Sequence, residues 1–319
     1  MQSKKIKRII YILLLIFASI FAQSFLYACE NTHKEYEIVC TLFPQYDFCR
    51  EILGKEDGIK LLLDYGKDAH SYELTLTDKK NIENSKAFFY IGGESEKWVN
   101  DVKNSTDLST TKMICLSEGI DLIPIIHSDD ISDNDNEHMH EQMFDEHIFL
   151  SLKNSIKMCE NIYKTLCEIY PEKVDELTVN YDNYISKLTS LDTQYKETIN
   201  KLKNKTMIMA DRFPFIYTAR DYGIECYAAF NGCSSDMEIT IGKKLDLQKK
   251  YLELNLPGVF IIENGNKDLA NSIMGSKGGK IYELHSCQSI TKQESNEETY
   301  LTLMNRNLNV FKEGLTVVD

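Results

Sequence analysis

The chain has 319 residues, of which 43% are hydrophobic, and it carries a formal net charge of −13 at pH 7. This length and apolar content suffice for one large domain or two ordinary ones. The acidic balance excludes nucleic acid as a partner, because phosphates demand a basic surface, and it is compatible with the attraction of cations.

Residues 1–28 predict a secretory signal peptide. Four basic residues precede an apolar run at residues 9–22, which is short for a membrane span. The following Leu26-Tyr27-Ala28-Cys29 resembles a bacterial lipobox, and that resemblance implies cleavage before Cys29 and lipid on its thiol. Lipid chains would hold the protein at the outer face of the cell membrane. An uncleaved membrane anchor is the alternative.

Short apolar runs alternate with helical patterns in the first half of the chain. Strands are predicted at residues 36–42, 59–63 and 87–91, and helices at residues 45–53 and 76–84. Such alternation is typical of a parallel sheet with helices on its faces. We therefore expect an α/β lobe over residues 30–171.

A long helical stretch follows this lobe. Residues 151–170 and 172–203 carry apolar side chains at steps of three and four, and Pro171 separates the two runs. The second run would be roughly 45–50 Å long as a helix, enough to lie across two lobes. One arm of a coiled coil is the alternative, but the apolar seam breaks strict heptads. We favour one rigid helix over residues 172–203 that joins two lobes.

The strand pattern restarts after residue 204. Strands are predicted at residues 206–210, 225–230, 258–263 and 280–284, which indicates a second α/β lobe over residues 204–319. The two lobes match in pattern, without an internal sequence repeat. The predicted fold class is therefore α/β, with a mainly parallel sheet in each lobe.

Residues 127–146 form a segment rich in histidine and acidic residues, with His127, His138 and His140. It cannot bury its charges, but imidazole and carboxylate suit zinc and its first-row neighbours. A disordered acidic linker is the alternative interpretation.

Eight cysteines remain beside Cys29, and no CxxC motif occurs among them, which excludes zinc-finger and thioredoxin-like sites. Most are expected to be small core residues. Cys233 and Cys287 lie in loops flanked by Gly or Ser and could form a disulfide.

Two histidines stand out as candidate metal ligands. His70 follows the strand predicted at residues 59–63, and loops after strand ends are where open α/β sheets bind ligands. His147 follows Asp145 and Glu146, which can orient a ligating imidazole and offset the positive end of the helix that begins near residue 151. From spacing alone, His70 could also be a surface residue.

Six short motifs occur in a specific order, around His70 and at residues 90–99, 145–148, 210–215, 284–287 and 299–304. Together they resemble the zinc/manganese solute-binding lipoproteins of bacterial ABC importers, over residues 36–319. The resemblance implies two α/β lobes joined by one rigid helix and a metal held in the cleft. It also implies that residues 127–146 are the metal-attracting loop of the zinc members.

The family uses three histidines and a carboxylate, or close variants, and the resemblance places His70 and His147 as the first two ligands. Arg212 stands where the third histidine is expected, and a charged guanidinium cannot bind a metal. We expect it to pair with Asp211 or a phenol. His285 is the predicted third ligand. The candidates for the fourth are Asp211, Cys287 and Gln288.

The resemblance predicts a monomeric, extracytoplasmic receptor, anchored through Cys29, that passes Zn²⁺ to the permease and ATPase subunits of an ABC importer. A manganese receptor is the alternative, since more oxygen ligands favour Mn²⁺; a zinc hydrolase and a surface adhesin are the other classes. Residues 140–144 begin as HExxH but end in Phe144, so the metalloprotease motif fails. We do not expect an enzyme.

Overall fold

The computed structural model describes residues 36–125, 143–230 and 239–315. The signal peptide, Cys29 and the loop histidines His127, His138 and His140 lie outside these residues. Residues 36–319 group as one compact unit, so the domain boundaries at residues 171 and 203 stay predictions. Among the described helices, none combines the length and apolar character needed to cross a membrane.

The first lobe is a four-stranded parallel sheet in the order β2-β1-β3-β4. Its strands are β1 (Ile38–Cys40), β2 (Ile59–Leu61), β3 (Ala87–Tyr90) and β4 (Lys112–Cys115). The helices α2 (Phe43–Leu53), α3 (Leu76–Glu83) and α4 (Trp98–Ser105) connect them. β4 was not predicted; its apolar run, residues 113–115, is short and only half-buried, and it follows the exposed Lys112.

The second lobe repeats this topology in the order β6-β5-β7-β8, again fully parallel. Its strands are β5 (Thr206–Met209), β6 (Glu225–Ala228), β7 (Gly258–Ile262) and β8 (Lys280–Leu284). The helices are α7 (Ile216–Tyr222), α8 (Ile241–Glu253), α9 (Lys267–Met274), the short α10 (Glu294–Glu297) and α11 (Tyr300–Gly314). The predicted fold class is confirmed.

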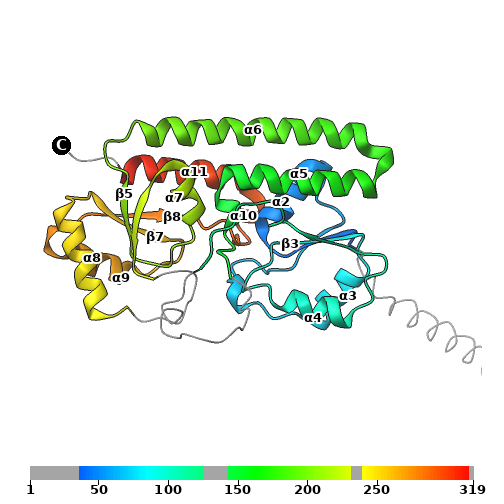
Figure 1. Cartoon of the computed structure of the whole chain (residues 1–319), viewed down its shortest axis with the longest axis horizontal. Helices are drawn as coiled ribbons and strands as arrows, with labels where there is room; N and C mark the ends of the chain where they lie inside the picture. The colour runs from blue at the N-terminus through cyan, green and yellow to red at the C-terminus, as the bar shows by residue number, and fades with distance from the viewer. Residues whose placement is uncertain (1–35, 126–142, 231–238, 316–319) are drawn as a thin grey trace, which may run out of the picture. The chain divides into compact units, whose positions relative to one another are not determined.

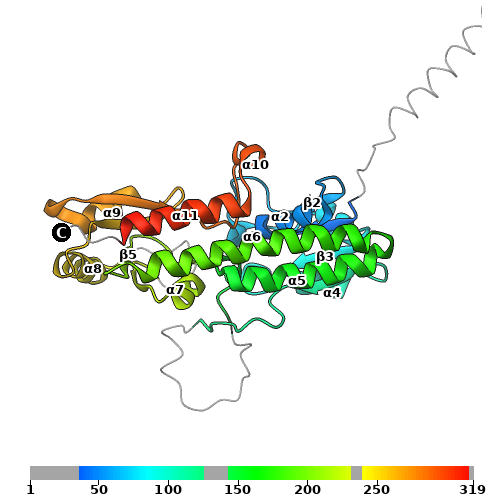
Figure 2. The same cartoon turned by 90° about the horizontal axis from the view of Figure 1, so that it is seen from above.

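Helix α6 (Val174–Asn200) is the long helix predicted between the lobes, and it follows α5 (Leu152–Ile169) after Pro171. Its 27 residues extend about 40 Å. The helix packs on α2 and α5 of the first lobe and on α7 and α11 of the second, as Figures 1 and 2 show. Its apolar stripe therefore contacts both lobes.

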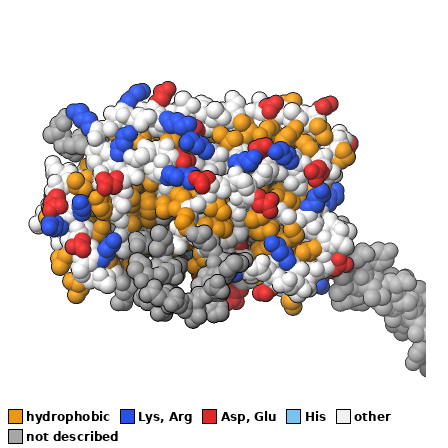
Figure 3. Space-filling view, viewed as in Figure 1, with side chains coloured by type: hydrophobic (Ala, Val, Ile, Leu, Met, Phe, Trp, Pro, Cys, Tyr) orange, Lys and Arg blue, Asp and Glu red, His pale blue; other side chains and the backbone are white. Residues whose placement is uncertain are grey.

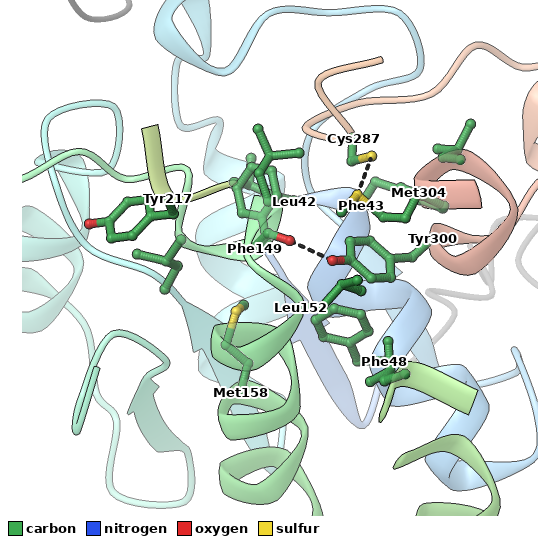
Figure 4. Packing of buried hydrophobic residues seen from close by; sticks show 14 of the residues in the cluster. Leu42, Phe43, Phe48, Phe149, Leu152, Met158, Tyr217, Cys287, Tyr300 and Met304 are labelled. Carbon is green, nitrogen blue, oxygen red and sulfur yellow. Dashed lines mark hydrogen bonds between the residues drawn. The ribbon is translucent and has the colours of Figure 1, made fainter. Parts of the chain in front are cut away.

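One hydrophobic core runs through the junction of the lobes. Tyr300 of α11 is fully buried, its ring meets Phe48 of α2 edge-on at 4.8 Å, and its hydroxyl donates a hydrogen bond to the carbonyl of Phe149 at 2.6 Å (Figure 4). The loops at the strand ends of both lobes are therefore supported by one common hydrophobic core.

The face shown in Figure 3 carries charges of both signs. On the face shown in Figure 3, Lys and Arg side chains are interspersed with Asp and Glu.

Candidate metal centre

Loops from both lobes line a pocket of about 480 Å³. The predicted ligands that line it are His70, His147, His285, Asp211 and Gln288, together with Arg212. Residues up to 218 positions apart in sequence thus meet at one place, at the carboxyl ends of the sheets, where open α/β folds bind ligands.

His70 lies in a 3₁₀ turn, Ala69–Ser71, shortly after β2. Asp68 caps this turn, because its Oδ1 accepts a hydrogen bond from the His70 amide at 2.9 Å. The imidazole is one-fifth exposed, and its Nε2 lies 3.6 Å from Glu146 Oε1. The cap fixes the backbone that carries this candidate ligand.

His147 is almost fully buried just before a 3₁₀ turn, Ile148–Leu150. Its amide and its ring Nδ1 both lie within hydrogen-bond distance of Asp145 Oδ1, at 2.9 and 3.0 Å. A carboxylate only accepts hydrogen bonds, so Nδ1 carries the proton and Nε2 of the neutral ring keeps its lone pair. This is how a carboxylate orients a metal-binding histidine.

The His70 and His147 rings lie 6.4 Å apart between centroids. Within the described ranges, no three or more His, Cys, Asp and Glu side chains are grouped so that they could hold a metal ion as they stand. A bound ion therefore requires side-chain movement, and His70, the more exposed of the two rings, has more room to move.

His285 has the opposite proton arrangement. The amide of Cys287 donates a hydrogen bond to His285 Nδ1 at 2.9 Å, so the neutral ring carries its proton on Nε2, which lies 3.7 Å from Glu294 Oε1. Burial lowers the pKa of His285 and favours this neutral ring. Metal binding by His285 requires its ring to give up the bond to Cys287, so its role as third ligand stays a prediction.

Arg212 forms an ion pair with Asp68, at 2.7 Å between Nη1 and Oδ2. Asp211 accepts a hydrogen bond from the Arg212 backbone amide at 2.8 Å. The pair with Asp68 was not among the predicted partners of Arg212, and a further interaction of Arg212 with Asp211 or a phenol stays a prediction. The pair links the loop after β5 to the loop that carries His70.

The three candidates for the fourth ligand differ in placement. Asp211 faces the turn after β7, since a Cβ added at Gly265 would lie 2.1 Å from its Oδ2. Gln288 is buried, and its Nε2 has no hydrogen-bond partner among the described residues. Cys287 is a free thiol buried in the core, next to Met304 at 3.9 Å between sulfurs, and the proposed partner Cys233 lies outside the described residues.

Residues 38–314 match the family described as zinc-uptake complex component A, periplasmic. The chain belongs to this family.

Individual members of the family are moderately similar in sequence. The zinc-binding lipoprotein AdcA of Streptococcus pneumoniae is 29% identical over 293 residues, which are 91% of this chain and 58% of AdcA. The chain thus spans less than two thirds of AdcA. The high-affinity zinc uptake system protein ZnuA of Bacillus subtilis is 25% identical, with 91% of each chain covered.

A solved structure of the family has the same fold. The Zn(II)-bound ZnuA-like domain of Streptococcus pneumoniae AdcA superposes with a TM-score of 0.73 at 27% identity, covering 89% of this chain and all of that domain. The predicted resemblance to metal-binding receptors of this family is confirmed.

Sequence reasoning missed two residues at the candidate site. Asp68 was not singled out, although an Asp two residues before a candidate ligand is a common cap. Glu146 was considered only as a carboxylate that orients His147 and as a charge near a helix end, because its neighbour His147 was the evident ligand. Its closeness to His70, 76 positions earlier, could not be seen in the sequence.

Proposed function

We propose that the chain captures Zn²⁺ in the pocket between its lobes and delivers it to an ABC-type importer. The observation that carries this proposal is the Asp145–His147 hydrogen bond. It places the ring proton on Nδ1 and the lone pair on Nε2, in a ring that lies beside a second histidine, His70. The names of the family and of its relatives, zinc-uptake component and zinc-binding lipoprotein, support zinc as the cargo.

The chemistry is binding without turnover. Imidazole nitrogen suits zinc, and a site closed by protein ligands leaves no position for a reactive water. His285, with Asp211, Cys287 or Gln288, is the proposed contribution of the second lobe. A manganese receptor would need more oxygen ligands, and the two imidazoles favour zinc.

The location and partners are part of the same proposal. The protein is an extracytoplasmic monomer, anchored to the membrane through lipid on Cys29, and it hands the ion to the permease of an importer whose ATPase is a separate subunit. The segment at residues 127–146, with His127, His138 and His140, raises the local concentration of cations through weak sites.

Metal analysis of the purified mature chain tests this function. One equivalent of Zn²⁺ should bind tightly, and His70→Ala and His147→Ala should each weaken it roughly a hundredfold or more, measured by competition with a chelator. His33→Ala is the matched histidine control and should bind like wild type. If the wild-type chain binds no zinc, or if both variants keep full zinc affinity, the proposed receptor function is refuted. Zinc-dependent hydrolysis would indicate the enzyme alternative.

A further inference from the structure

We propose that Glu146 is a metal ligand, so that the ion is held within the first lobe by His70 Nε2, His147 Nε2 and Glu146 Oε1. This inference rests on the proposed function and names a residue of the same site. It makes the site two imidazoles and one carboxylate before the second lobe contributes any ligand.

The Glu146 carboxylate is buried with one oxygen unsatisfied. Its side chain is 6% exposed. Oε2 accepts a hydrogen bond from the Ser95 amide at 3.0 Å, and Oε1 has no hydrogen-bond partner among the described residues. A buried carboxylate oxygen without a donor is costly. A bound cation would remove that cost.

The position of this oxygen fits a shared ion. Glu146 Oε1 and His70 Nε2 are 3.6 Å apart, too far for a hydrogen bond. Two donors bound to one tetrahedral zinc at about 2.0–2.1 Å lie roughly 3.3 Å from each other. A small rotation of His70 therefore suffices for both atoms to bind the same ion.

The backbone holds the carboxylate in place. Gly93 has φ 99°, and a Cβ built on it would lie 2.7 Å from Glu146 Oε2. Only glycine leaves room for the carboxylate against this loop, which also supplies the Ser95 amide. Oε2 is thus fixed, and Oε1 is left for the ion.

Most of the other acidic side chains near the pocket already have partners. Asp145 holds His147, and Asp68 pairs with Arg212. Glu96 accepts hydrogen bonds from the amides of residues 91 and 92 and from a threonine hydroxyl. Glu294 lies 3.5 Å from an Arg306 nitrogen. Asp211 Oδ2 also lacks a hydrogen-bond partner among the described residues, but it faces the turn after β7. The unpartnered oxygen of Glu146 instead lies 3.6 Å from His70 Nε2.

The test compares Glu146→Gln with Glu94→Gln, which removes one charge from an exposed glutamate near the same loop. Zn²⁺ affinity is measured by chelator competition, and the visible spectrum of the Co²⁺-loaded chain reports on the ligand set. We expect Glu146→Gln to bind zinc roughly 10–100-fold more weakly, with an altered Co²⁺ spectrum, and Glu94→Gln to match wild type.

A second variant covers the outcome in which Glu146→Gln does not fold. Glu146→Asp keeps the charge but shortens the side chain by one methylene, so it should also lose affinity and shift the Co²⁺ spectrum. Thermal unfolding of the metal-free proteins shows which variants are folded. If folded Glu146 variants bind zinc and Co²⁺ like wild type while His70→Ala and His147→Ala do not, Glu146 is not a ligand and the receptor function stands. If wild type itself binds no zinc, the function fails.

Discussion

Asp68 interacts with the second lobe and with the backbone of one candidate ligand, and the two interactions can be tested separately. Oδ1 caps the turn of His70, and Oδ2 pairs with Arg212. Asp68→Asn keeps an acceptor for the His70 amide and removes the charge, because asparagine caps as well as aspartate does. Asp68→Ala removes both interactions.

The expected losses of stability follow from how exposed the two side chains are. The Arg212 and Asp68 side chains are 24% and 32% exposed, so we assign the ion pair the modest value of partly exposed pairs, about 0.5 kcal/mol. A lost cap adds about 1 kcal/mol. Asp68→Asn should therefore lower the free energy of unfolding of the metal-free protein by about 0.5 kcal/mol, and Asp68→Ala by about 1.5 kcal/mol.

Zinc affinity should also fall, since the Arg212 charge at the pocket wall loses its counter-charge. A unit charge and a divalent ion roughly 8 Å apart in a water-like dielectric repel by about 1 kcal/mol, which is about a fivefold weaker affinity. This part should shrink at high salt.

Denaturant unfolding and chelator competition at low and high salt measure both effects. Equal zinc affinity of wild type and Asp68→Asn at low salt would refute the electrostatic reasoning. Equal stability of the two Asp68 variants would refute the capping role.

Three further predictions concern the pH dependence of stability, the loop under Glu146 and the long helix. Burial raises the pKa of Glu96 to about 7 from 4.5. Its contribution to stability is therefore fully present below about pH 4.5 and lost as the pH rises through about 7. In wild type this lowers the free energy of unfolding by up to about 3 kcal/mol over that pH range, and Glu96→Gln should abolish this decrease when unfolding is measured as a function of pH. Gly93→Ala should displace Glu146 and weaken zinc binding. Gly223→Ala, also at positive φ (70°) but with nothing within 4 Å, should cost stability alone, and equal zinc affinities of the two variants would contradict this. Leu188→Ala, fully buried in α6, should lower the free energy of unfolding by about 2–5 kcal/mol, and a loss below about 1 kcal/mol in denaturant unfolding would show that the stripe does not carry the packing.

The sequence pattern predicted most of the fold because apolar periodicity reports burial. The seven predicted strands all occur, with ends within two residues. β4 was missed: it lies at the edge of its sheet beside β3 alone, and its apolar residues, 113–115, are few and only half-buried. The common strand order of the lobes was also hidden, since topology can repeat without sequence repetition.

The site was only partly predictable for a different reason. Residue type and loop position identify His70 and His147, and the structure brings both to one pocket. Which ring nitrogen carries a proton depends on contacts that spacing does not reveal, such as the Cys287 amide at His285. The ion pair of Asp68 with Arg212 joins residues 144 positions apart, so it too appears only in the folded chain.

With the proposed ligand set, the two lobes would have different tasks. The first lobe would bind the ion, because its oriented histidine, His147, and the unused carboxylate oxygen of Glu146 lie there. The second lobe would close over it through the Arg212–Asp68 pair. Separating such a partly exposed pair costs at most about 1 kcal/mol, much less than the hundredfold or greater loss of affinity, about 2.7 kcal/mol, expected when a zinc ligand is removed. Once the ligand from the second lobe leaves the ion, separation of this pair would uncover the ion while His70, His147 and Glu146 still hold it, as the proposed delivery requires.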